Sequence, residues 1–165
     1  MAGLLDGVKV LDLTRVLAGP YCGMMLADMG AEVTKIELPG RGDDSRRNFP
    51  IVNGESAYFM NLNRNKRGMT LNLKSEKGKE IFRELVKQSD IVLENYRPGV
   101  MEKLGLGYED LKKINPAIIY GAVSGFGHYG PYSKRAGYDI IGQAMSGLMS
   151  TTGWPGGPAT RCGTP

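Results

Sequence analysis

One stretch, residues 7–37 (GVKVLDLTRVLAGPYCGMMLADMGAEVTKIE), constrains the fold of this chain more than any other. The β-branched run at residues 8–13 is typical of a buried strand. Pro20 suits the first position of a helix, and apolar residues at three- and four-residue spacing continue that helix until Gly30, a left-handed cap. Residues 33–36 begin a second strand. The stretch is therefore one βαβ unit, whose two strands are expected to be parallel with a right-handed crossover.

The rest of the chain continues this alternation of strand and helix patterns. Strands are predicted at residues 70–73, 90–94 and 117–123. One helix is predicted to begin after Ser75 as its cap, and a separate short helix is predicted to end at residue 104. Further helices are predicted at residues 109–114 and after Asp139 as the cap, and the last of these has an apolar face that extends to Met149. Residues 58–62 form only a short apolar patch. The alternation predicts an α/β fold with a Rossmann-like, mostly parallel sheet and flanking helices.

Ligands of such sheets bind at the carboxyl ends of the strands, which here means residues 14–20 and 38–44. Four basic residues lie near predicted strand ends, and together they would suit phosphate groups. They are Arg41, Arg97, Lys103 and Arg135. The residues alone therefore indicate an α/β domain that binds a phosphorylated small molecule.

Several other functional classes fit the sequence poorly. The turn after the first strand, TRVLAGP, lacks the G-x-G-x-x-G of dinucleotide-binding proteins. Ser146, in QAMSG, lacks the first glycine of a hydrolase nucleophile elbow. The net charge is +4, but acidic residues are interleaved with the basic ones, so nucleic acid is not an expected partner. His128, the one histidine, lies in a polar, glycine-rich loop where a structural or substrate-facing role is favoured over that of a general base.

Composition indicates a cytoplasmic protein that binds no metal and does not enter a membrane. Cys22 and Cys162 lie far apart without a CxxC pattern, which argues against a disulfide scaffold and a zinc site. The longest uncharged run, between Asp139 and Arg161, is interrupted by Gly, Ser, Thr and Pro. No basic patch followed by an apolar stretch marks a signal peptide at the N-terminus.

Five stretches, in this order, carry a resemblance to a known family and cover nearly the whole chain. They are LDGVKVLDLTRVLAGPYCGMMLADMGAEVTKIE, GRGDDSR, NRNKRGMTLNLKSEKGKE, DIVLENYRPGVMEKLGLGYEDLKKINPAIIYGAVSGFG and AGYDIIGQAMSGLMSTTG. The sequence resembles the N-terminal part of the class III CoA-transferases, the group that contains formyl-CoA and carnitine CoA-transferases. The resemblance implies that residues 1–165 are the N-terminal part of a CoA-binding large domain, without the small domain and the C-terminal return segment.

The same resemblance implies where coenzyme A, as a substrate, would bind. Residues 16–18 and 95–97 follow predicted strands, and residues 71–74 would flank the adenine of CoA. Lys103 would reach a phosphate group, and residues 136–138 would lie near the pantetheine arm. Arg41 replaces the basic residue that the family often has where this chain has Leu38. The implied contacts are Val16, Leu17, Ala18, Arg41, Leu71, Asn72, Leu73, Lys74, Asn95, Tyr96, Arg97, Lys103, Arg135, Ala136, Gly137 and Tyr138.

The family's reaction, as the resemblance implies it, moves CoA from an acyl-CoA to a carboxylic acid through an aspartyl-CoA thioester. The nucleophilic aspartate is expected beyond Pro165, so no catalytic residue is assigned within the chain, and the fragment alone is expected to be inactive. Family members are longer and form interlocked homodimers. Residues 140–149 would leave apolar surface available for association.

Three alternatives remain open from the sequence. A non-catalytic CoA-binding or assembly fragment would bind CoA without turnover. A racemase of the α-methylacyl-CoA type would need a base where this chain has Tyr138, and a phenol titrating near 10 serves poorly at neutral pH. A nucleic-acid binder would show steeply salt-dependent binding.

Overall fold

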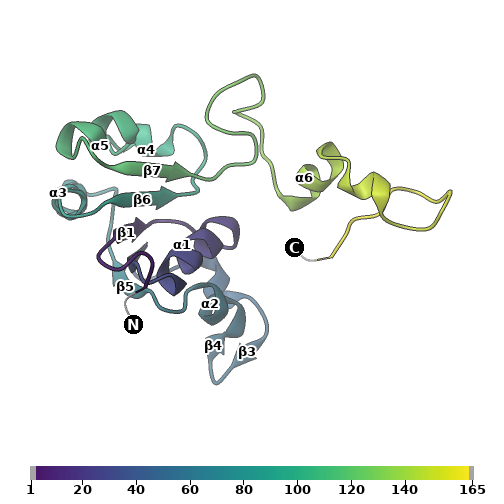
Figure 1. Ribbon diagram of the computed structural model, residues 1–165, viewed down its shortest axis with the longest axis horizontal. Helices are drawn as coiled ribbons and strands as arrows, with labels where there is room; N and C mark the ends of the chain where they lie inside the picture. The colour runs from purple at the N-terminus through teal and green to yellow at the C-terminus, as the bar shows by residue number, and fades with distance from the viewer. Residues whose placement is uncertain (1–2, 164–165) are drawn as a thin grey trace. The chain divides into compact units, whose positions relative to one another are not determined.

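The chain forms two compact units in a computed structural model that describes residues 3–163 (Figure 1). Unit 1 contains the described residues up to Val123, and unit 2 begins at Ser124. Unit 1 contains the sheet and its covering helices, whereas unit 2 contains helical turns and loops. Each unit is described by itself below.

Unit 1 is built on a five-stranded parallel sheet of order β5-β2-β1-β6-β7. Its strands are β1 (Lys9–Asp12), β2 (Glu32–Glu37), β5 (Arg67–Thr70), β6 (Ile91–Glu94) and β7 (Ile119–Ala122). The register pairs Lys9 with Glu32 and Val10 with Ile91 on the two sides of β1. The predicted α/β fold with a parallel, Rossmann-like sheet and flanking helices is therefore confirmed.

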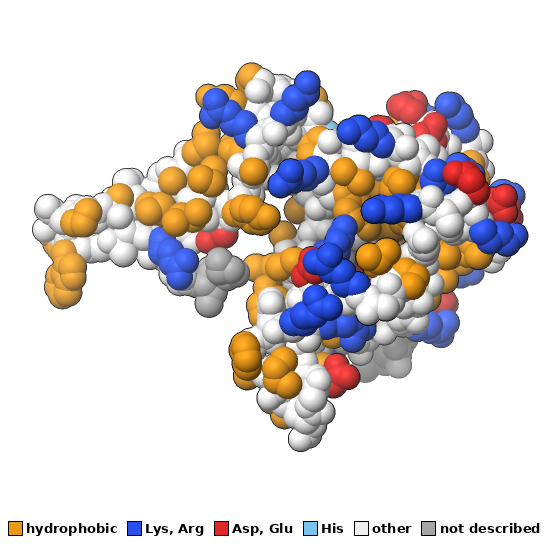
Figure 2. All heavy atoms as spheres, turned by 180° about the vertical axis from the view of Figure 1, so that it is seen from behind, with side chains coloured by type: hydrophobic (Ala, Val, Ile, Leu, Met, Phe, Trp, Pro, Cys, Tyr) orange, Lys and Arg blue, Asp and Glu red, His pale blue; other side chains and the backbone are white. Residues whose placement is uncertain are grey.

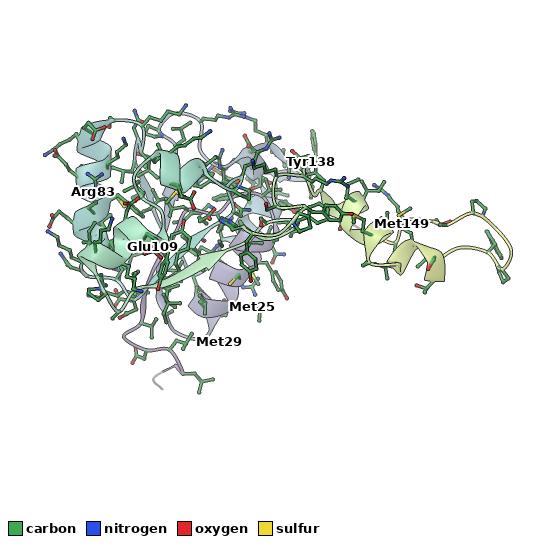
Figure 3. The ribbon with its side chains drawn as sticks, turned by 90° about the horizontal axis from the view of Figure 1, so that it is seen from above. Met25, Met29, Arg83, Glu109, Tyr138 and Met149 are labelled. Atoms are coloured by element: carbon green, nitrogen blue, oxygen red, sulfur yellow. The ribbon has the colours of Figure 1, made fainter. Side chains whose placement is uncertain are left out.

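Helices cover both faces of this sheet, because the strands carry apolar side chains on both faces. On one face, Val10, Val33 and Leu93 pack with Ala27 of α1 (Ala18–Asp28). On the other face, a larger core includes side chains of α3 (Glu76–Val86), α4 (Val100–Lys103) and α5 (Tyr108–Ile114). Phe82 of α3 is fully buried there. Figure 3 labels Met25 on α1 and Met29 directly after it, with Arg83 on α3 and Glu109 on α5.

Helix ends in unit 1 follow local capping chemistry. Gly30 takes the left-handed conformation (φ 103°) after α1, and the Ser75 hydroxyl accepts a hydrogen bond from the Gly78 N–H at the start of α3, as predicted. The predicted start of α1 at Pro20 is wrong by two residues. The helix begins at Ala18, which places Pro20 within its first turn, where a missing N–H is tolerated.

The strand predicted at residues 70–73 is also wrong in its position. It spans Arg67–Thr70 as β5, beside β2 at the edge of the sheet. Leu71 and Leu73, which produced the alternating pattern, are buried in the core from the turn that follows the strand. The alternating apolar pattern therefore came from a turn that buries two leucine side chains, and not from a strand.

Short elements join β2 to β5. They are η1 (Asp44–Arg47), the hairpin of β3 (Ile51–Val52) and β4 (Glu55–Ser56), and α2 (Ala57–Leu62). Where α2 lies, only a short apolar patch at residues 58–62 is predicted, so this helix is missed. The cap explains the helix, because the Ser56 side chain accepts a hydrogen bond from the Phe59 N–H (3.1 Å).

Unit 2 contains α6 (Asp139–Met145) and η2 (Leu148–Thr151). The prediction that Asp139 caps the final helix is wrong. Tyr138 is the N-cap residue, and the Asp139 carboxylate instead accepts a hydrogen bond from the Gln143 side chain (2.6 Å). The predicted helical face to Met149 is also interrupted, because Gly147 is left-handed (φ 83°) between α6 and η2. Figure 3 labels Tyr138 and Met149 at either end of this segment.

Apolar side chains are exposed along unit 2 (Figure 2). They include Tyr138, Ile140, Ile141, Met145, Leu148 and Trp154. No helix within residues 3–163 is long and apolar enough to span a bilayer.

Candidate functional site

The order of the sheet reverses beside β1. From β1 the chain moves to β2 and then β5 on one side, and afterwards to β6 and β7 on the other. The loops after β1 and β6 therefore leave the carboxyl edge of the sheet, where all five strands end, in opposite directions. In open parallel sheets this switch point is where ligands bind.

A three-residue turn, Thr14, Arg15 and Val16, lies at the switch point and is called the clamped turn below. The Arg15 N–H donates to the Asn95 side-chain oxygen (2.8 Å), and the Asn95 amide donates back to the Arg15 carbonyl (2.7 Å). Asn95 directly follows β6, so these two bonds join the loops on either side of the switch point.

Side chains from three further positions hold the rest of the turn. The Asp12 carboxylate accepts hydrogen bonds from the Thr14 N–H (2.9 Å) and hydroxyl. The buried Lys35 ammonium donates to the Thr14 carbonyl (2.8 Å), and the Val16 N–H donates to Asp43 Oδ1 (3.2 Å). Every backbone polar group from the Thr14 N–H to the Val16 N–H is thus bonded to a side chain.

Val16 adopts a left-handed backbone conformation, with φ of 69°. This conformation is rare for any residue except glycine and is a steric outlier for a β-branched one. Such a residue persists only where its surroundings determine its conformation, and strain of this kind is concentrated at functional sites.

Two buried ion pairs support the clamped turn. Lys35 Nζ lies 2.9 Å from Asp43 Oδ2, and Lys66 Nζ lies 2.8 Å from Asp12 Oδ2. All four side chains are at most 2% exposed. Gly23 of α1 makes room for the second pair, because a Cβ there would lie 2.5 Å from Asp12 Oδ2.

Burial and the partner charges act in opposite directions on these groups. Burial would raise the pKa of Asp43, but the Lys35 ammonium and the Ser45 hydrogen bonds outweigh it, so the pKa of Asp43 lies below its ordinary value. For Lys66 burial dominates, and it lowers the pKa of the ammonium despite the opposing charge of Asp12.

The loop after β2 is organised by a third, half-exposed pair. The Arg46 guanidinium binds Glu37 through two hydrogen bonds (2.8 and 2.7 Å) and stacks on the Phe59 ring, 3.8 Å from its centre. Arg41, a predicted phosphate contact, pairs with Asp44 at the surface (2.8 Å). An exposed pair of this kind is weak and leaves the guanidinium available to an anion.

The other predicted contacts are distributed unevenly in the structure. Asn95 and Tyr96 lie at the switch point, where the Arg15 guanidinium lies over the Tyr96 ring at 4.8 Å from its centre. Among the predicted contacts at residues 71–74, Leu71 and Leu73 are buried, whereas the side chains of Asn72 and Lys74 are exposed. Four predicted contacts belong to unit 2, namely Arg135, Ala136, Gly137 and Tyr138.

The remaining predicted contacts lie in unit 1 beside the strand ends. Leu17 is the N-cap residue of α1 and Ala18 is its first residue, whereas Arg97 follows β6 and Lys103 ends α4 as exposed side chains.

Sequence reasoning missed five residues that build this site: Asp12, Arg15, Lys35, Asp43 and Lys66. Lysines on a charged chain are ordinarily solvated, and nothing in the local sequence pattern showed that two of them are buried. Arg15 was hidden within a loop whose importance was recognised. Its place next to Thr14, directly after a buried strand, was the one available signal.

The arrangement suits an anionic ligand. Helix α1 begins at the carboxyl edge, its N-cap residue Leu17 makes no side-chain capping bond within the described residues, and its first turn carries no acidic residue. Helix N-termini favour anions, and the half-buried Arg15 adds a full positive charge beside this one. Figure 2 shows further Lys and Arg side chains gathered on one face of unit 1.

The chain is similar in sequence to several named CoA-transferases. The chain is 53% identical over 160 residues to succinyl-CoA:glutarate CoA-transferase of Mus musculus, a match that covers 96% of this chain and 37% of that protein. It is 52% identical over 161 residues to acetyl-CoA:oxalate CoA-transferase of Acetobacter aceti, covering 98% of this chain and 41% of that protein. The chain thus spans about two-fifths of the length of these curated relatives.

A solved structure extends the comparison to the fold. The crystal structure of a CAIB/BAIF family protein from Brucella suis superimposes with a TM-score of 0.93 at 46% sequence identity, over 99% of this chain and 44% of that one. The model of the family described as CoA-transferase family III matches residues 5–165. The chain therefore belongs to CoA-transferase family III.

Proposed function

We propose that the complete protein transfers CoA between an acyl-CoA and a carboxylic acid, and that the carboxyl edge of unit 1 holds the CoA. One observation carries the proposal. The clamped turn, held on both sides, lies at the switch point of a family III chain, next to the N-terminus of α1. Two similar proteins are named succinyl-CoA:glutarate and acetyl-CoA:oxalate CoA-transferase, and the acids in these names, glutarate and oxalate, are dicarboxylic.

The proposed chemistry uses an aspartate beyond Pro165 as the nucleophile. Its carboxylate attacks the thioester carbonyl of the donor, which releases CoA thiolate and forms a mixed anhydride. The thiolate attacks the aspartyl carbonyl of this anhydride, which gives the aspartyl-CoA thioester and the free donor acid. The acceptor carboxylate then attacks that thioester, which releases CoA thiolate and forms a second mixed anhydride. The thiolate attacks the acceptor's carbonyl of this anhydride, which gives the acceptor's CoA ester and regenerates the aspartate.

The residues of this chain bind and orient the CoA in this scheme. The backbone of Val16, Leu17 and Ala18, followed by Asn95, Tyr96 and Arg97, would line the CoA at the switch point. Arg41 and Lys103 would reach its phosphates. Asn72 and Lys74 would flank the adenine with the backbone around them. The segment that contains Tyr138 would lie near the pantetheine arm.

The proposed setting is a cytoplasmic homodimer. Both cysteines, Cys22 and Cys162, are free thiols, which fits a reducing compartment. The exposed apolar side chains of unit 2 supply surface that a second copy or the remainder of the protein could cover.

The test is a transfer assay with the complete protein. Succinyl-CoA or acetyl-CoA is supplied with a panel of isotopically labelled carboxylic acids, and labelled acyl-CoA is measured. We expect transfer to at least one dicarboxylic acid, and a protein-bound thioester that hydroxylamine releases in the absence of acceptor. Binding of CoA with no transfer to any acid would contradict the proposal, as would wash-in of solvent deuterium at the α-carbon of a 2-methylacyl-CoA in place of transfer.

A further inference from the structure

The buried ion pair Lys35–Asp43 lies against the clamped turn, and its burial was not predicted from the sequence. Burying two charges costs desolvation energy, and a buried ion pair is often no more stabilising than an apolar pair of the same size. Its geometry therefore raises the question of what the pair does for the turn.

Both members of the pair bond the turn directly. Lys35 donates to the Thr14 carbonyl at 2.8 Å, and Asp43 Oδ1 accepts the Val16 N–H at 3.2 Å. These two bonds flank Arg15, so they fix the peptide groups on either side of it. The Val16 N–H bond is made to the residue whose φ is 69°.

Asp43 is itself held rigidly. Its backbone N–H donates to the Glu37 carboxylate (2.8 Å), and its Oδ1 also accepts the Ser45 N–H (2.9 Å) and hydroxyl (2.8 Å). Lys35 lies on β2, so its position is set by the sheet. The acceptor offered to Val16 is therefore fixed by the sheet and by the loop after β2, both of which are distant from the turn in sequence.

We propose that the Lys35–Asp43 pair is a positioning device that holds Val16 in its left-handed conformation and thereby sets the shape of the turn that binds CoA. Without the pair, Val16 relaxes toward an ordinary negative φ, which rotates the peptide group leading into Leu17 and Ala18. The inference rests on the proposed function, because CoA is the ligand whose binding reports the shape of the turn.

The test is a double-mutant cycle in the complete protein, with the Kd for CoA measured by calorimetry. Asp43→Ala is expected to raise the Kd about tenfold, the order that the strain of a left-handed non-glycine residue allows. The same substitution in a Val16→Gly background is expected to change the Kd little, because glycine takes a positive φ without being held there. The cycle also cancels whatever the Val16 side chain itself contributes.

A matched control uses another left-handed residue. Asn53 has φ of 52° in the β3–β4 hairpin, so Asn53→Gly relieves the same kind of strain away from the turn. We expect Asp43→Ala to cost the same tenfold in this background. The thermal midpoint separates positioning from stability, because Asp43→Ala should lower Tm in all three backgrounds by leaving Lys35 buried without its partner.

If Asp43→Ala does not fold, the double variant Lys35→Met/Asp43→Leu replaces it, since apolar side chains of similar size remove both bonds to the turn and leave no buried charge unpaired. An unchanged Kd in the Asp43 variant would overturn the inference, and so would an equal loss of affinity in the Val16→Gly and Asn53→Gly backgrounds. Failure of the unsubstituted protein to bind CoA would overturn the proposed function instead.

Discussion

At the scale of single residues, the site depends on side chains that satisfy the backbone of another loop. Asn95 is the clearest case, because its one amide group bonds both the N–H and the carbonyl of Arg15. Asn115 likewise bonds the backbone of another segment, at the amino edge of the sheet. Its side-chain amide donates to the carbonyls of Val86 (3.1 Å) and Ser89 (2.8 Å). The two asparagines therefore allow stability and ligand binding to be separated.

Asn95→Ala and Asn115→Ala should both lower the free energy of unfolding by about 1–3 kcal/mol, since each removes side-chain hydrogen bonds to several backbone groups. Of the two variants, only Asn95→Ala should weaken CoA binding, because Asn95 bonds the clamped turn and Asn115 does not. Urea unfolding and calorimetric titration of the complete protein measure the two effects. Equal losses of CoA affinity in the two variants would show that Asn95 acts through general stability.

Asp43 predicts a specific response to acid. Because its pKa is lowered in the folded state, it contributes stability above its unfolded pKa of about 4, and this contribution is lost as the pH falls through the folded value. Tm should therefore fall less steeply below about pH 4 in Asp43→Asn than in the unsubstituted protein. Glu80→Gln, which removes an exposed partner of Lys77, should leave the slope unchanged. Parallel Tm curves for Asp43→Asn and the unsubstituted protein would contradict this expectation.

At the scale of elements, the sequence predicted what depends on local pattern and missed what depends on distant contacts. The first βαβ unit, α3 with its Ser75 cap, and the parallel sheet followed from apolar spacing and turn residues. The strand at residues 70–73 was misplaced because Leu71 and Leu73 are buried from a turn. Lys35, Asp43 and Lys66 gave no local signal, because each is buried by pairing with a residue far away in the sequence or across a loop.

The packing of α1 on the buried Asp12–Lys66 pair gives a prediction for this helix. Gly23→Ala places a Cβ 2.5 Å from Asp12 Oδ2 and 3.1 Å from Lys66 Nζ, so α1 must shift, at a cost of about 1–3 kcal/mol in unfolding free energy. Gly68→Ala in β5 of the same unit meets nothing within 4 Å and should be neutral or stabilising. Urea unfolding compares the two. Equal stability of both variants would mean that α1 does not depend on close approach to this pair.

At the scale of the whole molecule, the proposed reaction needs more residues than this chain contains. It matches about two-fifths of the length of its curated relatives, and the proposed nucleophile lies outside it. Unit 1 by itself has a turn, at the carboxyl edge of its sheet, that is held in a strained conformation, and we propose that this edge binds CoA. The family could be recognised from the sequence because five stretches occur in order, whereas the bonds that hold the turn became visible only in the structure.

The most direct test of this account is amide hydrogen exchange of the complete protein, measured by mass spectrometry with and without saturating CoA. Binding at the carboxyl edge predicts slower exchange in peptides that contain Val16–Ala18 and Asn95–Arg97. Exchange in the β3–β4 hairpin and in α5, away from this edge, should be unchanged. Slower exchange confined to the hairpin, α5 or other segments away from the switch point would contradict the assignment of this edge as the CoA site.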